Sequence, residues 1–473
     1  MSNRVKPPTP PLGEEIGPVL DKTVSRLEGY DRGGEDDEKG VQLDRLERFN
    51  TALGEGISGP AAAAEAAQGA LTGDESVEPG WKGWVCVLGA FLMNSVCYGM
   101  INSFGVFQSY YALNQLSANS TTQISWIGSI QLCFTPLLGC FSGPLFDAGY
   151  LKHLILAGGS LYVFCMFMTS IAKVYWQFLL AHGIGVGIGM GIMFSPSVSC
   201  LSHHFGRSKW RSLVYGIQAT GSCLGGIIFP ILGRNLLPRI GFAWTIRVFG
   251  FIVLAVVVIV FFSLSTVHPP RNRIAILSVS VFRNIGYTFH TIGSGCGIAA
   301  IYCPLTFSVT YGRTIGLPDN LANYSVAIMN GCSFFGRTMP LLAAQWSGPI
   351  NIQTGFAITS SVMLFCWTRA RDVPGWMVYI AMYGVSSGAY AASYNPSAAS
   401  FAPSPDQVGL YIGMSFFINS FFALTGTPIT AALIRGSNYL GASMFCGGIV
   451  AMAACCLLVA RVFKARQAGS PLV

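Results

Sequence analysis

From Trp81 almost to the end of the chain, apolar segments long enough to cross a lipid bilayer follow one another. A helix that spans the bilayer core needs about 20 apolar residues, and about twelve segments have this length. They lie at about 84–110, 123–145, 152–172, 175–198, 211–233, 243–266, 284–308, 322–345, 352–368, 375–398, 408–433 and 439–463. Because lipid offers no hydrogen-bond partner to the backbone, the sequence predicts an all-α membrane protein with about twelve transmembrane helices.

Charge is distributed unevenly along the chain. Only 10% of the residues are charged and 52% are hydrophobic, whereas soluble domains are about 25% charged. Beyond residue 80 the acids are Asp147, Asp319, Asp372 and Asp406, and all the other acidic side chains lie in residues 1–80. That polar segment has too few large apolar residues to offset the entropy of ordering, so we expect a disordered cytosolic tail there.

The two halves of the apolar region carry matching prolines. The fourth predicted helix ends in FSPSVSCL with Pro196, and the tenth ends in YNPSAASF with Pro396. The helix after each contains another proline, Pro230 or Pro428. Proline frees a backbone carbonyl and permits bending, which suits a gating role. Paired, interrupted segments in two halves are typical of a secondary transporter built from repeats.

This repetition predicts five parts of the chain. They are a disordered cytosolic tail (1–80), an N-terminal six-helix bundle (81–267), a short cytosolic linker (268–283), a C-terminal six-helix bundle (284–466) and a C-terminal tail (467–473). With the first tail inside, the Lys and Arg residues of the loops show a weak positive-inside bias.

The stretch AHGIGVGIGMGIMFSPS (181–197) has glycine at every second position from Gly183 to Gly191. A dinucleotide fingerprint would need glycine three residues after Gly185, where isoleucine stands. On a helix, Gly183, Gly187 and Gly191 form one stripe of small residues, and a second stripe lies nearly opposite. We therefore predict a helix wedged between two partners, which either packs closely or slides during transport.

Four motifs resemble one family of transporters. Trp81–Gln108 (WKGWVCVLGAFLMNSVCYGMINSFGVFQ) resembles the first helix of the monocarboxylate porter family of the major facilitator superfamily. Gly143–Leu154 resembles the loop between helices two and three, His203–Gly226 resembles the entry to helix five, and Asn330–Pro340 resembles helix eight. This resemblance covers about 81–466 and points to fungal members, many of which accompany natural-product pathways. It implies the major facilitator fold, in which two six-helix bundles give alternating access to a central cavity.

Two departures from that family concern proton coupling. Asn102 stands where animal lactate porters carry a lysine, and Ser333 stands where they carry an aspartate four residues before an arginine. In the loop after helix two, Ala148 follows Asp147 in place of the usual basic residue. The proton-relay pair of lactate porters is therefore missing, which argues against lactate transport by that mechanism.

Arg337 is the main candidate for substrate binding. It lies deep in the eighth predicted helix, and no Asp or Glu stands near mid-membrane to pair with it. An unpaired guanidinium there is costly, so it should face a cavity or a partner. A carboxylate, enolate or phosphate would accept two parallel hydrogen bonds from it. The alternative is a structural arginine that bonds backbone carbonyls.

Other polar and aromatic side chains within the spans are candidates for the same path. The further substrate-binding candidates are Asn102, Tyr98, Ser333, Tyr287, His290, Tyr394 and Asn395, and Gln218, Asn330, Asn419 and Tyr390 have either this role or a packing role. By the resemblance, helices one, seven and ten line the cavity. Aromatic side chains there suit a flat or conjugated substrate, with simple packing as the alternative.

Three titratable groups are candidates for proton coupling. His182 and His290 lie within spans, and Asp147 lies at the cytosolic edge. Histidine exchanges protons near neutral pH, and the alternative for each ring is a hydrogen bond to a neighbouring helix. Two sequons, at Asn119 and Asn323, fall in or beside outer loops and predict glycosylation.

Together these features predict a secondary active transporter of a small organic anion or amphipathic metabolite, with efflux of a fungal secondary metabolite preferred. The alternatives are uptake of a monocarboxylate or a riboflavin-like compound, and a sensor on a transporter scaffold. No catalytic cluster is visible within the spans, so we expect no enzyme, no cofactor and no metal site. The expected partners are the small-molecule substrate, the lipid bilayer and protons, and not nucleic acid. The plasma membrane is the expected location, with the vacuole or another endomembrane as the alternative.

Overall fold

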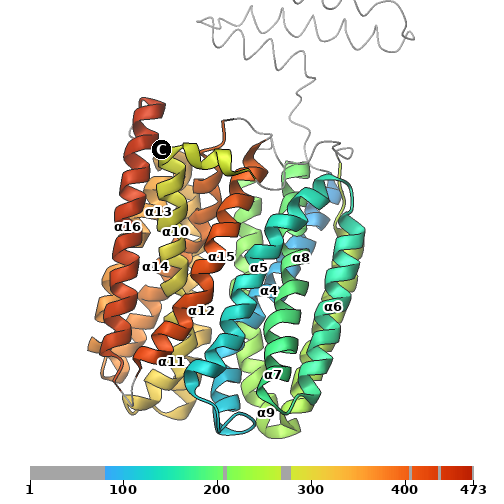
Figure 1. The fold of residues 1–473 in the computed structure, drawn as a ribbon, viewed down its shortest axis with the longest axis vertical. Helices are drawn as coiled ribbons and strands as arrows, with labels where there is room; N and C mark the ends of the chain where they lie inside the picture. The colour runs from blue at the N-terminus through green and yellow to red at the C-terminus, as the bar shows by residue number, and fades with distance from the viewer. Residues whose placement is uncertain (1–79, 206–209, 268–277, 404–406, 435–437, 471–473) are drawn as a thin grey trace, which may run out of the picture. The chain divides into compact units, whose positions relative to one another are not determined.

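The computed structural model describes residues 80–205, 210–267, 278–403, 407–434 and 438–470. The predicted tail up to residue 79 and most of the predicted linker lie outside these ranges. The helices before residue 268 are α4 (Trp81–Leu113), α5 (Thr121–Asp147), α6 (Leu151–Ile171), α7 (Tyr175–Phe178), the π-helix η1 (Leu179–Gly185), α8 (Val186–Phe205) and α9 (Arg211–Ser263). Those after it are η2 (Val279–Arg283), α10 (Ile285–Ile301), α11 (Cys303–Thr314), α12 (Asp319–Ser347), α13 (Pro349–Cys366), η3 (Trp367–Arg369), α14 (Val373–Ala399), α15 (Val408–Leu433) and α16 (Leu440–Ala468) (Figure 1).

The predicted all-α architecture is confirmed within these ranges. Nine of the described helical segments are long and apolar enough to span a bilayer. One of them, α9, makes two passes, because Phe229 and Phe249 on its two parts bring their ring centroids within 5.1 Å. The remaining two of the twelve predicted spans are α12 and α14, in which polar residues such as Asn330 and Arg337 lower the mean hydropathy.

The connection within α9 differs from the prediction. Arg234 and Arg239 were expected in an outer loop, but the backbone stays helical through both of them. Only Gly241 leaves the helical region, with φ 73° and ψ 171°. This positive φ is open to glycine at no steric cost, so a single residue breaks the helix.

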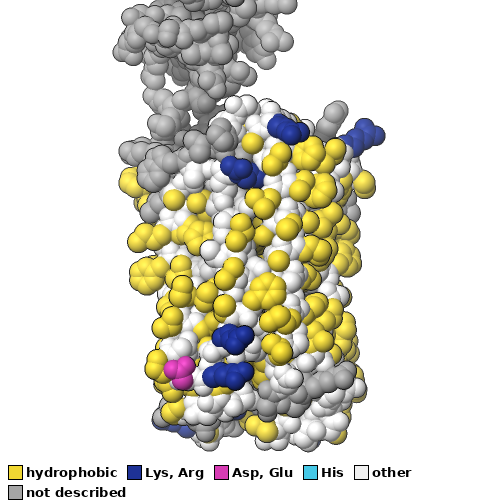
Figure 2. Space-filling model, turned by 90° about the vertical axis from the view of Figure 1, so that its left-hand side faces the viewer, with side chains coloured by type: hydrophobic (Ala, Val, Ile, Leu, Met, Phe, Trp, Pro, Cys, Tyr) yellow, Lys and Arg dark blue, Asp and Glu magenta, His cyan; other side chains and the backbone are white. Residues whose placement is uncertain are grey.

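The surface of the helical body has the character of a membrane protein. Exposed apolar side chains such as Leu156, Phe164 and Met382 cover the outer helix faces. On the face drawn in Figure 2, the Lys and Arg side chains lie near the two ends of the body, and an apolar band separates them. This pattern matches a hydrocarbon core between two aqueous boundaries.

The described residues form two large hydrophobic cores that follow the chain order and a third, smaller core around Tyr287 in the second half. One core joins buried side chains of α4 to α9, among them Phe107 and Phe249. A second core joins α10 to α16 and includes Trp367 and Trp376. The two sets contact each other through α5 with α15, α9 with α12, and α4 with α11. These three helix pairs are the contacts that a change between two bundle arrangements would have to alter.

Helix α8 lies between α5 and α6, and its glycines face both neighbours. A Cβ at Gly187 would lie 2.9 Å from Phe134 Cβ in α5, and one at Gly191 would lie 2.7 Å from the Phe134 carbonyl oxygen. On the other side, a Cβ at Gly189 would lie 2.9 Å from the carbonyl oxygen of Gly158 in α6. Only a hydrogen at these positions allows the backbones to approach this closely.

We expect Gly191→Ala to destabilise the protein, because its methyl group would meet backbone atoms of α5 that cannot turn away. Overpacking of this kind costs about 1–3 kcal/mol. The measurement is the thermal unfolding midpoint of the full-length protein in detergent. Gly448→Ala is the matched control, since a Cβ at Gly448 of α16 meets nothing within 4 Å. Equal midpoints for the two variants would contradict the close-packing role.

Candidate functional site

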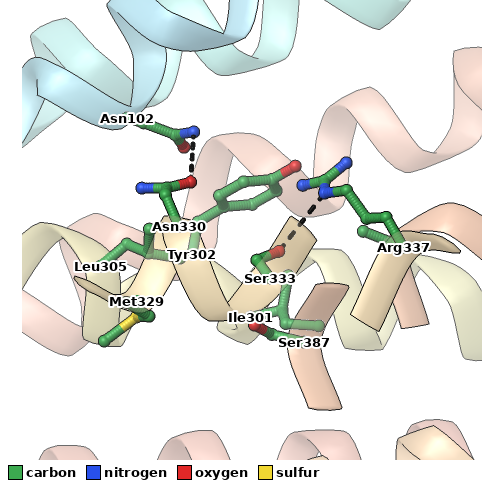
Figure 3. A pocket seen from close by; sticks show the side chains of 10 residues that line it. Asn102, Ile301, Tyr302, Leu305, Met329, Asn330, Ser333, Arg337 and Ser387 are labelled. Carbon is green, nitrogen blue, oxygen red and sulfur yellow. Dashed lines mark hydrogen bonds between the residues drawn. The ribbon is translucent and has the colours of Figure 1, made fainter. Parts of the chain in front are cut away.

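Arg337 lies in the interior of α12, several turns from either end of the helix. Its guanidinium Nε donates a hydrogen bond of 3.3 Å to Ser333 Oγ, one turn earlier. The hydroxyl of Tyr302 lies beside the guanidinium, and both side chains line the same cavity (Figure 3). The Arg337 side chain is partly exposed, whereas Ser333 is buried. Both neighbouring hydroxyls are neutral, so the positive charge is solvated by dipoles alone.

A small cavity of about 20 Å³ lies beside this guanidinium. Four segments supply its wall, namely α4, the α10–α11 junction, α12 and α14. The lining residues are Asn102, Ile301, Tyr302, Leu305, Met329, Asn330, Ser333, Arg337, Ser387 and Ala391. This volume holds about one water molecule. An organic ligand therefore needs the four segments to move apart before it can reach Arg337.

No acidic side chain stands in the middle of any described helix. Asp147 ends α5, Asp319 begins α12, and Asp372 precedes α14. Among the described residues, no three His, Cys, Asp or Glu side chains are grouped to hold a metal ion. The chemistry available at the cavity is thus that of one fixed cation surrounded by hydroxyl, amide and aromatic groups, which suits the binding of an anion.

Tyr302 is the site residue that sequence reasoning missed. It occupies the single residue between α10 and α11, with φ −86° and ψ −11°. The signal that could have found it is Pro304, which lacks an N–H and so favours a helix start just after Tyr302. The predicted span 284–308 instead ran through this junction as one helix.

Asn102 and Asn330 form a bridge between the two halves of the chain. Asn102 Nδ2 in α4 donates to Asn330 Oδ1 in α12 over 3.1 Å. Asn330 Nδ2 donates to the carbonyl oxygens of Gly226 in α9, at 3.2 Å, and of Val326 in its own helix, at 3.0 Å. Gly226 permits this approach, because a Cβ there would lie 2.6 Å from Asn330 Oδ1. We call these three residues, Asn102, Asn330 and Gly226, the amide bridge.

The cavity brings together three of the predicted substrate-binding residues, Arg337, Asn102 and Ser333. Tyr98 lies outside its lining but packs on Phe194 with ring centroids 5.3 Å apart. It stands one helical turn before Asn102, which lines the cavity.

The remaining substrate-binding candidates lie in the second half, away from this lining. The Tyr287 hydroxyl donates to the carbonyl oxygen of Tyr411 over 2.5 Å. Tyr394 donates to Ser415 Oγ over 2.9 Å and accepts from Asn419 Nδ2 over 2.7 Å. Asn395 is partly exposed and its Oδ1 has no partner. A substrate role for these residues stays a prediction.

The two histidines have different surroundings. His182 Nδ1 meets the Tyr111 hydroxyl at 2.9 Å inside η1, with Phe104 and Phe107 packed edge-on around the ring. His290 Nε2 meets Gln353 Oε1 at 3.0 Å. The third candidate for proton coupling, Asp147, is the last residue of α5.

The predicted gating and glycosylation residues have clear positions. Pro196 and Pro396 lie inside α8 and α14, one in each half. Asn119 lies in the connection between α4 and α5 and is partly exposed. Asn323 lies within α12, and Ser325 of its sequon is buried and accepts a hydrogen bond from Trp376 Nε1.

We expect Asn330→Ala to destabilise the protein, since it leaves the Asn102 amide and the Gly226 carbonyl without their buried partner. The cost of such unmade bonds is about 1–3 kcal/mol. The thermal unfolding midpoint in detergent measures it. Asn114→Ala is the control, because the exposed Asn114 bonds only within its own chain segment, to the Tyr110 carbonyl. A midpoint for Asn330→Ala no lower than that of the control would show that the amide bridge contributes no stability.

Comparisons with known proteins agree with this architecture. The family model described as Major Facilitator Superfamily matches residues 84–404. The chain is 35% identical to the aspyridones efflux protein of Emericella nidulans over 79% of this chain and 78% of that protein. It is 34% identical to an MFS-type transporter of an Ophiocordyceps species (81% and 86%) and 33% identical to the agnestins efflux protein of Paecilomyces divaricatus (80% and 86%). The match over most of the chain, together with the helical architecture, shows that this multi-pass membrane protein belongs to the major facilitator superfamily of transporters.

Proposed function

We propose that this transporter exports small organic anions, and that its physiological substrate is an acidic secondary metabolite of the cell that makes it. The observation that carries the proposal is the Arg337 guanidinium, whose neighbours Ser333 and Tyr302 are both neutral and which borders a cavity between four helical segments. A fixed cation of this kind costs desolvation free energy in an apolar helical body unless an anion binds to it. An anionic substrate therefore gains more binding free energy at this site than a neutral substrate does.

The names of two relatives support the direction and the class of substrate. The aspyridones and agnestins efflux proteins are both named for the export of a metabolite. We propose the plasma membrane as its location, because a protein that exports a metabolite from the cell acts there. The motifs that resemble monocarboxylate porters, above all NGCSFFGRTMP around Arg337, support a place in or near that branch of the superfamily.

Alternating access follows from where the halves meet. We infer that residues 81–267 and 284–466 act as the two moving bundles, with 268–283 as the linker. Asn102 of the amide bridge lies in the second half of α4, which leads to Asn119. If Asn119 is glycosylated, this end of α4 is at the outer side of the membrane. Release of substrate to the outside then requires this bridge to open. Closure of the cavity and of the outer pathway would occur together, because Asn102 and Asn330 line the cavity as well.

We expect Arg337→Ala to lower export about a hundredfold, because an anion would lose two charge-assisted hydrogen bonds. Arg337→Lys should fail too, since an ammonium cannot reproduce the planar fork. The measurement is the ratio of the accumulating metabolite in medium and cells, in a deletion strain that expresses each variant at equal surface level. Arg371→Ala, which removes an exposed arginine next to Asp372, is the control. Normal export by both Arg337 variants would refute the anion site, and a metabolite that disappears from the medium would indicate uptake instead.

We propose that proton coupling depends on His290 more than on His182. His290 belongs to a polar chain, in which Gln353 Nε2 donates to Ser294 Oγ over 3.0 Å and Tyr394 stacks on the imidazole at 6.2 Å. Tyr394 is the titratable side chain that faces the ring, and Tyr390 bonds the Ser294 carbonyl nearby. His182 instead lies among aromatic rings and a single tyrosine hydroxyl.

We expect wild-type export to rise when the external pH falls from about 7.5 to 5.5, because inward proton flow would drive exchange. His290→Gln should export at a rate that no longer changes with external pH, while His182→Gln should keep the dependence. The medium-to-cell ratio of the metabolite in buffered media measures both. Unchanged pH dependence in His290→Gln would remove this residue from the coupling mechanism.

A further inference from the structure

We propose that Tyr302 is the second anion-binding group of the Arg337 site, and that the site takes an aromatic organic acid. The inference rests on the proposed anion transport and extends it in two ways. It adds a specificity-determining residue, and it names the chemical class of the substrate. The argument starts from the hydrogen bonds of the tyrosines.

Within the described part of the chain, the Tyr302 hydroxyl donates no hydrogen bond to a protein group. The hydroxyl lies beside the Arg337 guanidinium, and both side chains line the cavity (Figure 3). Apart from Tyr379, whose hydroxyl has no partner among the described residues, several other buried tyrosines donate to a protein acceptor. Examples are Tyr162 to the Val96 carbonyl, Tyr311 to the Ala370 carbonyl, Tyr383 to the Ile301 carbonyl and Tyr390 to the Ser294 carbonyl. For Tyr302 the described residues offer no such acceptor, and its hydrogen is left for a ligand.

The helix break holds Tyr302 in place. Pro304 has no N–H, so the ordinary helical bond to the Ala300 carbonyl cannot form. The next carbonyl, that of Ile301, instead accepts from the Tyr383 hydroxyl over 2.7 Å. The side chain between these two anchored positions points toward Arg337 and the cavity (Figure 3). Its position is therefore set by α11 and α14 and not by the ligand.

The two groups together form a site for a planar oxyanion. Ser333 accepts the Nε hydrogen of Arg337, which leaves the terminal nitrogens of the guanidinium for a ligand. One oxygen of a carboxylate or enolate can accept from a terminal guanidinium nitrogen while the Tyr302 hydroxyl donates to the same group.

Aromatic rings adjoin this site and connect the two halves of the chain. Tyr98, which stands one helical turn before Asn102 of the cavity wall, packs on Phe194 with ring centroids 5.3 Å apart. Phe194 of α8 meets Phe416 of α15 at 6.4 Å, and Phe416 stacks on Tyr394 at 5.7 Å. A flat conjugated body can pack on such rings while its acid group reaches Arg337 and Tyr302. Aliphatic acids would lose these contacts.

The experiment measures binding of four probes to the purified full-length protein, by the shift of its thermal unfolding midpoint with probe concentration. The probes are 2-naphthoate, its neutral isostere 2-naphthamide, and the pair hexanoate and hexanamide. We expect the wild type to bind 2-naphthoate at least about tenfold more tightly than the other three. Tyr302→Phe should weaken 2-naphthoate binding about tenfold, the value of one hydrogen bond to a charged group. Arg337→Ala should abolish binding.

Tyr383→Phe is the matched control. It removes a tyrosine hydroxyl from the same helix break, so it should lower the midpoint without changing the affinity for 2-naphthoate. Equal affinity of Tyr302→Phe and the wild type, or equal losses in Tyr302→Phe and Tyr383→Phe, would overturn the role of Tyr302 and leave the anion site standing. Hexanoate that binds as tightly as 2-naphthoate would overturn the aromatic class. Binding that survives Arg337→Ala, equal binding of acid and amide, or no binding of either acid would overturn the proposed function as well.

Discussion

In the proposed mechanism, the chemistry of this protein depends on the positive charge of Arg337, which has no acidic partner among the described residues. The cost of holding a guanidinium inside an apolar helical body is high, and it falls only as far as nearby dipoles replace water. Around Arg337 those dipoles are the hydroxyls of Ser333 and Tyr302. Neither can cancel the charge. An acidic partner would have neutralised the charge within the protein. Without one nearby, binding of an anion gives the largest favourable change in free energy at this site.

The surroundings of that charge are built by close backbone contacts. Glycines let α8 approach α5 and α6, and Gly226 lets α9 receive the Asn330 amide. In the major facilitator superfamily, the helices of each bundle have to stay together while the two bundles move. Close backbone contacts within each half keep the helices of that half together. The amide bridge differs from them, because it is polar, joins the halves and borders the cavity. A bond between neutral amides can be exchanged for bonds to water or substrate at small net cost.

Much of this arrangement could be predicted from the sequence, for definite physical reasons. The helices were predictable because lipid leaves the backbone no alternative, so length and hydropathy suffice. Arg337, Asn102 and Ser333 were predictable because a polar group inside a span stands out against its neighbours. Tyr302 was not, because tyrosine is common in spans and its significance comes from a helix break. The turn at Gly241 lies inside the predicted gap between spans 211–233 and 243–266, but the sequence did not show that a single residue with positive φ would replace a loop there.

The unpaired charge of the site also has an electrical consequence. Across a membrane that is negative inside, a full charge gains or loses about 2.3 kcal/mol for each 100 mV of potential that it crosses. A carrier whose empty site bears a guanidinium is therefore drawn toward the arrangement that opens to the cytosol. Once an anion neutralises the site, the loaded carrier reorients with little influence from the voltage. The resting potential would thus favour the arrangement in which the empty site opens to the cytosol, where new substrate is made. Arg337 would then act as a voltage sensor.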